Sequence, residues 1–580
     1  MRNATVPLTT IMDFTLFQKP QRYIGNEWNV VKKTHHGKIK ICVCYPDYYE
    51  IGMSNLGLRI IYGMLNEFED VVCERTFMPG IDLCGFLIKN RKILFSLETK
   101  TNLNEFEVIG FNLNYELNFI NFLRILSLGG IVLEAKERKN TIVLGGAIAN
   151  PEPLADFVDV FCLGEFEGVA DKFIEILRKY KDKESRLKGF SEIDGLYVPK
   201  FYAVNFHNNS FKFEKVYSYA QLPIKKVYIK DLDSAYYPLK WLVPNTSIIH
   251  DRVPIEIARG CPNACVFCQA KALYHPYRER RPSTILGFMK EIYKNSGYEN
   301  FSFLALSASD YSAIKNITTE ALDYFKDKRI GLSLPSLRID DIVGGLYNKI
   351  LPLKKTSLTV AVEAARDDLR NKLNKNIDIN KLFETGKIIR SLNLRHIKIY
   401  FMFGFHDENE DDLIAIGKFL NTLRQQTRLE LNVSINIFSP KPFSAWQNHA
   451  LIEENVLHSR RETILKNIPP HRGIKVSLSS IKKSILETIL SRGDRGLGPV
   501  IYRVFLKEFE PSGYSENFSW DIWEQAMKDE GIDYRFYLEA KTENFPWSFI
   551  ENRSGRTRIE TRNNAEDFGV NLPPKRDPAK

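Results

Sequence analysis

The sequence of 580 residues predicts an α/β protein in which a doubly wound, Rossmann-like domain precedes a partial, TIM-type barrel and a mostly helical C-terminal extension. Two patterns predict this order. From Lys38, short apolar runs alternate with helical periods, as in a parallel sheet with crossover helices. From residue 254, a strand and a helix repeat about every 30 residues, which is the spacing of a βα barrel.

Composition is that of an ordinary globular protein, with 44% hydrophobic and 26% charged residues. We expect a cytoplasmic protein with no membrane partner, because no apolar run reaches about 18 residues and the first ten residues lack the apolar core of a signal peptide. The net charge of +10 is compatible with an anionic substrate, a phosphate-bearing cofactor or nucleic acid. The basic residues are diffuse, so nucleic-acid binding has no specific support.

The first domain is expected over residues 38–182, after a polar lead-in at residues 1–37. Ligands of doubly wound sheets bind beyond the carboxyl ends of the strands. Strands are predicted at residues 39–45, 71–76, 108–113, 141–144 and 158–163, with helices at 115–128 and 168–180. The candidate ligand-binding residues after these strands are Met53, Ser54, Asn112, Asn114, Tyr115, Gly145, Gly146, Gly164 and Glu165.

The rest of the chain divides into four segments. A connector at residues 183–247 contains a predicted hairpin over residues 196–217. A helical extension is expected at residues 451–555 and a loose polar tail at residues 556–580. The barrel lies between them, at residues 248–450, with six strands predicted at residues 254–258, 302–307, 330–334, 357–362, 396–402 and 430–437.

A loop with three cysteines, Cys261, Cys265 and Cys268, follows the first barrel strand. Three thiols within eight residues can surround one inorganic cluster and leave one iron without a protein ligand. Structural zinc fits less well, because it needs four ligands and the loop has one C-x-x-C pair. Eight cysteines in 580 residues are too few for a disulfide scaffold. The spacing predicts an iron-sulfur cluster with an open coordination site.

Polar residues follow the other barrel strands, where a barrel places its chemistry. An arginine at position 338 is suited to pair with a carboxylate. The structural alternatives are that Asp310 caps a turn and that Glu363 and Arg366 form a salt bridge on one helix face. The candidates are Ser309, Asp310, Arg338, Glu363, Arg366 and Gly404.

The cysteine loop, with Phe267 before its last cysteine, resembles the signature of the radical S-adenosylmethionine (radical SAM) superfamily. The resemblance implies a 4Fe-4S cluster held by the three cysteines, whose open iron binds S-adenosylmethionine and whose electron cleaves it to a 5'-deoxyadenosyl radical. It also implies an external one-electron reductant of the flavodoxin or ferredoxin type. Phe267 and the six candidates after the other barrel strands are then expected to contact S-adenosylmethionine.

The first domain resembles the cobalamin-binding domain that precedes many radical SAM barrels, through Val143 to Pro153 and Asp159 to Glu165. The resemblance implies cobalamin bound over the loops with the nine candidate residues. The fingerprint that supplies an axial histidine is replaced by Asp47-Tyr-Tyr-Glu-Ile-Gly52, so cobalt is expected to lack that ligand. Residues 21–27, 46–57, 150–153, 250–252 and 492–495 together resemble a bacterial family that fuses these two domains and has no settled substrate.

These resemblances favour a cobalamin-dependent methyltransferase that acts on an unactivated carbon of an unknown substrate. One alternative is a radical SAM enzyme without cobalamin, which catalyses methylthiolation, a rearrangement or another modification of RNA, protein or a metabolite. A nonenzymatic module that uses the cysteines for structure or sensing is a second alternative. Cysteines of the first domain are interpreted as core residues, with a second cluster as the alternative; they are Cys42, Cys44, Cys73, Cys84 and Cys162.

Overall fold

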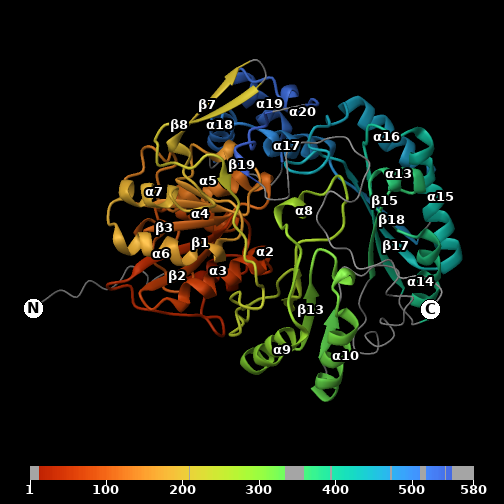
Figure 1. Ribbon diagram of the computed structural model, residues 1–580, viewed down its shortest axis with the longest axis horizontal. Coiled ribbons are helices and arrows are strands. Elements are labelled where there is room, and N and C mark those ends of the chain that lie inside the picture. The colour runs from red at the N-terminus through yellow and green to blue at the C-terminus, as the bar shows by residue number, and fades with distance from the viewer. Residues whose placement is uncertain are drawn as a thin grey trace, which may run out of the picture.

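The computed structural model describes residues 12–551, apart from 208–209, 329, 334–357, 376, 392–394, 471–472, 510–517 and 542–543. Figure 1 shows the first domain on the left, the barrel strands from the centre (β13) to the right (β15, β17 and β18) and the C-terminal helices along the top. Among the described residues, no helix is long and apolar enough to cross a membrane.

A six-stranded sheet forms the first domain, in the order β2-β1-β3-β4-β5-β6, and all neighbours are parallel except β5 and β6. Every residue of β2 is buried, as expected for a strand covered on both faces. The five predicted strands are confirmed to within three residues at each end. The strands are β1 (Ile39–Tyr45), β2 (Val71–Phe77), β3 (Val108–Asn112), β4 (Ile142–Gly146), β5 (Val160–Cys162) and β6 (Leu196–Tyr197).

The strand order places a topological switch point between β1 and β3, where ligands of doubly wound folds bind. Helix α3 begins beside it, because the Asn55 side chain accepts a hydrogen bond from the Leu58 amide. The helices up to residue 191 are α1 (Gln21–Ile24), α2 (Tyr49–Gly52), α3 (Leu56–Glu67), α4 (Ile81–Lys89), α5 (Phe119–Leu128), α6 (Ala170–Lys179) and α7 (Lys183–Ser191).

The connector contains the predicted antiparallel hairpin, formed by β7 (Tyr202–His207) and β8 (Ser210–Lys215). Its next strand, β9 (Ile224–Lys225), pairs in parallel with β19 (Ile550–Glu551) near the end of the described chain. Residues more than 300 positions apart in the sequence are therefore joined in one small sheet.

The barrel strands form two parallel sheets, β10-β13-β14 and β15-β16-β17-β18. The six predicted strands are all present, and β18 adds a seventh inside the segment predicted to be helical. They are β10 (Val253–Glu256), β13 (Asn300–Leu304), β14 (Gly331–Ser333), β15 (Leu358–Glu363), β16 (His396–Phe403), β17 (Glu430–Ile437) and β18 (Ile474–Leu478). Their helices are α9 (Pro282–Ser296), α10 (Ile314–Phe325), α13 (Asp367–Lys372), α14 (Ile379–Ser391), α15 (Glu410–Thr427) and α16 (Glu454–Asn467).

The C-terminal helices pack on the first domain. Asn150 of the first domain donates hydrogen bonds to the carbonyls of Ser491 and Gly493, at 3.1 and 2.7 Å. Arg124 of α5 forms an ion pair of 2.8 Å with Glu508. These contacts fix the extension to the first domain. The helices are α17 (Ile481–Arg492), α18 (Leu497–Phe509), α19 (Trp520–Asp529) and α20 (Arg535–Leu538).

Candidate active site

The three cysteines lie in a loop whose base is a short antiparallel ladder between β11 (Ala258–Arg259) and β12 (Arg278–Glu279). Gly260 follows β11 with φ +86°, and a Cβ at that position would lie 2.8 Å from the carbonyl oxygens of Tyr274 and Pro276. Only glycine accommodates both the conformation and the close approach. The ladder and this glycine therefore return the chain on itself around the thiols.

The chemistry of the loop fits an iron-sulfur cluster. All three thiols are free and partly exposed. Burial raises the pKa values of the Cys265 and Cys268 thiols, an effect that the nearby Lys375 ammonium opposes. No three His, Cys, Asp or Glu side chains in the described part of the chain lie close enough to share one metal ion. The three thiols that bind a 4Fe-4S cluster can lie farther apart than the ligands of a single metal ion, because each cysteine binds a different iron.

Hydrogen bonds to the backbone hold the cysteine loop against the segments that follow β15 and β17. Asn374 donates to the Ala264 carbonyl at 3.0 Å, and the Val266 amide donates to the Leu373 carbonyl at 3.2 Å. The Trp446 amide, after β17, donates to the Val266 carbonyl at 3.1 Å. Phe267 packs on a small apolar cluster that is separate from the main core and consists of Ala364, Leu369, Leu373, Phe405 and Phe438.

The turn after β13 lies beside the first cysteine. The Asn263 amide donates to an Asp310 carboxylate oxygen at 2.6 Å and to the Cys261 sulfur at 3.4 Å. Tyr277 fixes the same turn by donating to the Asp310 carbonyl at 3.1 Å. Ser309 belongs to this turn and is partly buried. The structure thus brings Ser309 and Asp310 to the cysteine loop, and it adds Asn263, which the sequence did not single out.

Glu363 also lies near the cysteines, at the end of β15. It has φ +67°, where the register of β15 against β16 shifts, and its buried carboxylate pairs with Lys375 at 3.3 Å. Burial raises the pKa of Glu363, and the Lys375 charge opposes the rise. The same ammonium interacts electrostatically with Cys265. Glu363 and Lys375 therefore form a charged pair at the edge of the cysteine loop.

The remaining barrel candidates are placed differently. Arg366 is 38% exposed at its side chain and pairs with Asp368 at 2.8 Å and with Asp412 at 3.3 Å, on the side of α15. The predicted salt bridge between Arg366 and Glu363 is not among its contacts in the described residues. Gly404 ends β16 with φ +94° and donates its amide to Glu408 at 2.7 Å. Arg338 lies outside the described residues.

In the first domain, several candidates meet at the switch point. The Asn112 amide donates to Asn55 at 3.4 Å, whereas its carbonyl oxygen is buried and has no hydrogen-bond partner among the described residues. Gly146 has open space beside it, because an added Cβ would find only the Phe111 carbonyl within 4 Å, at 3.8 Å. Asn114 and Tyr115 follow β3 and are exposed. This edge has an unsatisfied polar atom and room for a ligand.

Five candidates have contacts within the protein. Met53 is fully buried, and its sulfur accepts a hydrogen bond of 3.1 Å from Arg75. The Ser54 hydroxyl accepts from the His250 amide at 3.1 Å. Gly145 and Gly164 are too close to their neighbours to carry a side chain. A Cβ added at Gly145 would lie 2.8 Å from the Phe161 ring, and one added at Gly164 would lie 2.0 Å from the Val227 carbonyl oxygen. Glu165 binds two arginines of the barrel.

Tyr49 occupies the position of the histidine in the cobalamin fingerprint. It is 1% exposed, its hydroxyl donates to Glu27 at 3.1 Å, and its ring packs on Phe77. Burial raises its pKa far above the ordinary range of tyrosine. Glu27 in turn pairs with buried Arg75 at 3.0 Å. Tyr49 is therefore held inside the first domain and does not replace the histidine as an exposed ligand.

A partly buried lysine connects the two candidate edges. Lys441, after β17, pairs with Glu116 at 3.3 Å and with Glu487 of α17 at 2.7 Å. Glu116 follows Tyr115 in the loop after β3. The carboxyl end of the barrel is thus joined directly to the loop at the switch point. Sequence patterns gave no signal for this residue, because its partners are distant in the chain.

The five other cysteines are all buried, which agrees with their interpretation as core residues. Cys42 and Cys44 lie on β1, Cys73 on β2 and Cys162 on β5. Cys84 lies on α4, where its thiol donates to the Pro79 carbonyl at 3.4 Å.

Comparisons with known proteins match two parts of the chain to families. Residues 57–199 match the family described as "Radical SAM proteins, N-terminal", and residues 255–420 match the "Radical SAM superfamily". The "Uncharacterized protein MJ0966" of Methanocaldococcus jannaschii is 24% identical over 461 residues, which cover 79% of this chain and 89% of that protein. The ribosomal protein uS12 methylthiotransferase RimO of Thermoanaerobacter sp. (strain X514) is 25% identical over 181 residues, 29% of this chain and 40% of RimO.

Two solved structures were compared with this chain. The radical S-adenosylmethionine methyltransferase TsrM from Kitasatospora setae, solved with cobalamin and a 4Fe-4S cluster bound, has a TM-score of 0.50 at 13% identity, covering 85% of this chain and 99% of that one. The cobalamin-dependent S-adenosylmethionine radical enzyme OxsB has a TM-score of 0.44 at 11% identity, over 86% of this chain and 72% of OxsB. The likeness to TsrM shows a common fold.

Proposed function

We propose that this chain is a cobalamin-dependent methyltransferase acting on an unactivated carbon, because residues 57–199 and 255–420 match radical SAM family models. The order of a doubly wound domain and a radical SAM barrel supports this proposal, since TsrM, which has the same fold, was solved with cobalamin bound. The substrate class stays open, because the described residues at either edge do not select one.

Three residues of the barrel are the proposed cluster ligands, namely Cys261, Cys265 and Cys268. When bound, the cluster supplies one electron that splits S-adenosylmethionine into methionine and a 5'-deoxyadenosyl radical, and cobalamin supplies a methyl group for the substrate. The Asp310 and Glu363 carboxylates lie at the loop, where they are suited to accept hydrogen bonds from the ammonium group of S-adenosylmethionine. Phe267 of the same loop packs on the small apolar cluster that includes Ala364.

The first domain contributes the proposed cobalamin site at the switch point between β1 and β3. The observation that carries the proposal is the unpartnered, buried carbonyl oxygen of Asn112 beside the open face of Gly146. A buried polar atom without a partner destabilises the fold unless a ligand or water satisfies it. The Glu116 to Lys441 ion pair holds this edge to the carboxyl end of the barrel. A substrate between the two edges would be within reach of both cofactors.

The alternative is a radical SAM enzyme that does not use cobalamin, such as a methylthiotransferase. The partial match to RimO favours it, although that match covers only 29% of this chain. A second cluster in the first domain would require several of its cysteines to leave buried positions on β1, β2, α4 and β5.

The test is anaerobic reconstitution with iron, sulfide and cobalamin, followed by gel filtration and metal analysis. We expect one 4Fe-4S cluster and one cobalamin per chain, and release of 5'-deoxyadenosine with a strong reductant. Cys265→Ala should abolish the cluster absorbance and the cleavage, whereas the matched control Cys84→Ala should retain both. Failure of the wild-type protein to retain any corrin would reject the methyltransferase and leave the cobalamin-independent alternative.

A further inference from the structure

The base of the cysteine loop has two positive charges that face each other. Arg259 of β11 is the ladder partner of Arg278 of β12. Both side chains are largely buried, at 9% and 8% exposure. Like charges directly opposite each other destabilise an antiparallel pair, and burial strengthens the repulsion. The ladder that closes the loop therefore needs an anion between its two arginines.

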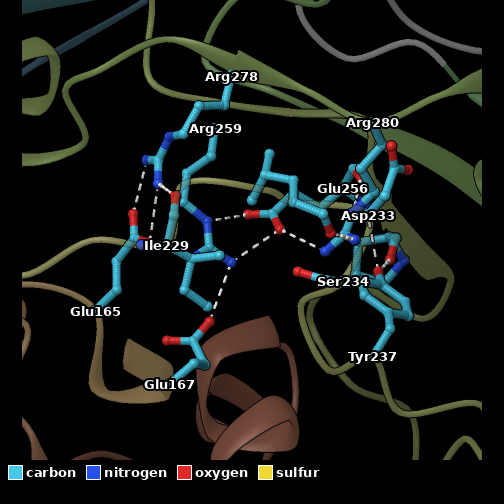
Figure 2. Close-up of polar contacts among 12 residues, drawn as sticks. Glu165, Glu167, Ile229, Asp233, Ser234, Tyr237, Glu256, Arg259, Arg278 and Arg280 are labelled. Carbon is cyan, nitrogen blue, oxygen red and sulfur yellow. Dashed lines mark hydrogen bonds and ion pairs between the residues drawn. The ribbon is translucent and has the colours of Figure 1, made fainter. Parts of the chain in front are cut away.

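Glu165 of the first domain supplies that anion (Figure 2). Its carboxylate binds Arg278 through both oxygens, at 2.7 and 3.0 Å, and Arg259 at 3.0 Å. The Ile229 amide donates a further hydrogen bond of 2.8 Å to the same carboxylate. Both carboxylate oxygens are thus occupied by partners from the connector and the barrel, and the side chain is 8% exposed.

The backbone before Glu165 is fixed as firmly as its side chain. Gly164 has φ +123°, and a Cβ there would lie 2.0 Å from the Val227 carbonyl oxygen. The Glu165 amide donates to that same carbonyl at 3.0 Å. The end of β5 is therefore docked on the connector in one position, which aims the carboxylate at the two arginines.

Further buried charged side chains belong to the same network and make its positive and negative charges equal in number. Arg259 also binds Glu167 at 3.1 Å and Glu256 through two hydrogen bonds of 3.0 Å. Arg280 reaches Glu256 at 3.4 Å and is fully buried. Three guanidinium groups thus meet three carboxylates in one buried network. Removing one partner from such a network leaves an uncompensated charge, which is far more destabilising than losing an exposed ion pair.

We propose that Glu165 is a positioning residue: it closes the base of the cysteine loop from the neighbouring domain and so fixes the cluster relative to the switch point. This assigns Glu165 a role different from the predicted cobalamin contact. The inference rests on the proposed cluster ligands and does not require that cobalamin binds.

The experiment compares Glu165→Gln with the wild-type protein after cluster reconstitution. Iron release to an excess of a chelator is followed by absorbance, and we expect it to be about tenfold faster in the variant, because buried Arg278 loses its carboxylate partner while Arg259 keeps Glu167 and Glu256. Glu165→Gln combined with Arg278→Met removes one of the repelling charges, so it should release iron more slowly than Glu165→Gln alone. The control is Asp70→Asn, which breaks the exposed pair with Arg178 in the same domain.

A second measurement needs no cluster. Lys271 lies within the loop, so trypsin cleavage after Lys271 in the apoprotein reports how well the base is closed. We expect faster cleavage in Glu165→Gln and wild-type cleavage in Asp70→Asn. Equal cleavage and equal iron release in Glu165→Gln and the wild type would overturn the proposal. A wild-type protein that binds no iron would instead reject the proposed function, while the cleavage assay still decides the role of Glu165.

Discussion

The side-chain amide of Asn263 donates a hydrogen bond to the sulfur of Cys261 across 3.4 Å. The same nitrogen donates to Asp310 at 2.6 Å, so the carboxylate orients the amide toward the sulfur. Hydrogen bonds to cluster sulfurs favour the reduced, more negative state and raise the reduction potential. Asn263 therefore couples the turn after β13 to a proposed cluster ligand.

Asn263→Ala is expected to lower the reduction potential of the reconstituted cluster. A net hydrogen bond is worth about 1 kcal/mol, on the order of 40 mV for a one-electron couple. Potentiometric titration followed by electron paramagnetic resonance measures this shift. Asn374→Gly is the matched control, because it removes an amide that binds the Ala264 carbonyl and no sulfur, and glycine accepts the φ of +51° at that position. An unchanged potential in Asn263→Ala would contradict the expectation.

Glu363 lies near the cysteines, whereas Arg366 lies toward α15. Substitutions of these two residues should therefore differ in their effect on the affinity for S-adenosylmethionine. Glu363→Gln is expected to weaken binding about tenfold, because a charge-assisted hydrogen bond near the cysteines is lost. Arg366→Ala should change affinity less than about twofold, since its ion pairs are partly exposed and lie toward α15. Isothermal titration of cluster-loaded protein measures both. Equal losses would show that Arg366 reaches the ligand.

Glu408 is expected to make the stability of the barrel depend on pH. Burial raises its pKa to about 7, against the opposing effects of the Gly404 amide and Arg460. Between about pH 4.5 and pH 7 the unfolded chain releases this proton while the folded chain keeps it, so the folded state loses stability as the pH rises. Above pH 7 both states are ionised and the loss stays constant.

Glu408→Gln should remove this contribution. The free energy of unfolding of the wild type, relative to that of the variant, is expected to fall by about 3 kcal/mol at most between pH 4.5 and pH 7.5. Denaturant unfolding at a series of pH values measures the difference. A relative stability that rises with pH in this window would show that the Arg460 ion pair dominates over burial.

Sequence patterns located all eleven predicted parallel strands, because such strands are either continuous apolar runs or, as in β17, alternate polar and apolar residues. The sequence patterns did not predict β18 (Ile474–Leu478), because this strand lies after residue 450, where the barrel was predicted to end. Its residues alternate apolar and polar side chains. Alternation is a strand signal, but the segment was short and flanked by helices. The cysteine spacing identified the loop, since its ligands are adjacent in sequence.

The roles of single side chains were harder to predict than the elements that hold them. Glycine after a strand signals a close approach, yet Gly146 faces open space while Gly164 faces the Val227 carbonyl. Glu165 follows a strand end like a ligand contact, but its partners Arg259 and Arg278 come from another domain. Such pairings depend on how the domains pack, which local patterns do not contain.

Tyr49 gives a last expectation, about the proposed cobalamin. Because its hydroxyl is buried against Glu27, Tyr49→Phe should leave the electron paramagnetic resonance spectrum of bound cob(II)alamin unchanged, as tyrosine is not a ligand. The same variant should lower the free energy of unfolding by about 1 to 3 kcal/mol, because the Glu27 carboxylate loses a buried donor beside Arg75. A changed cobalt spectrum at unchanged stability would reverse this assignment and place the tyrosine at the metal.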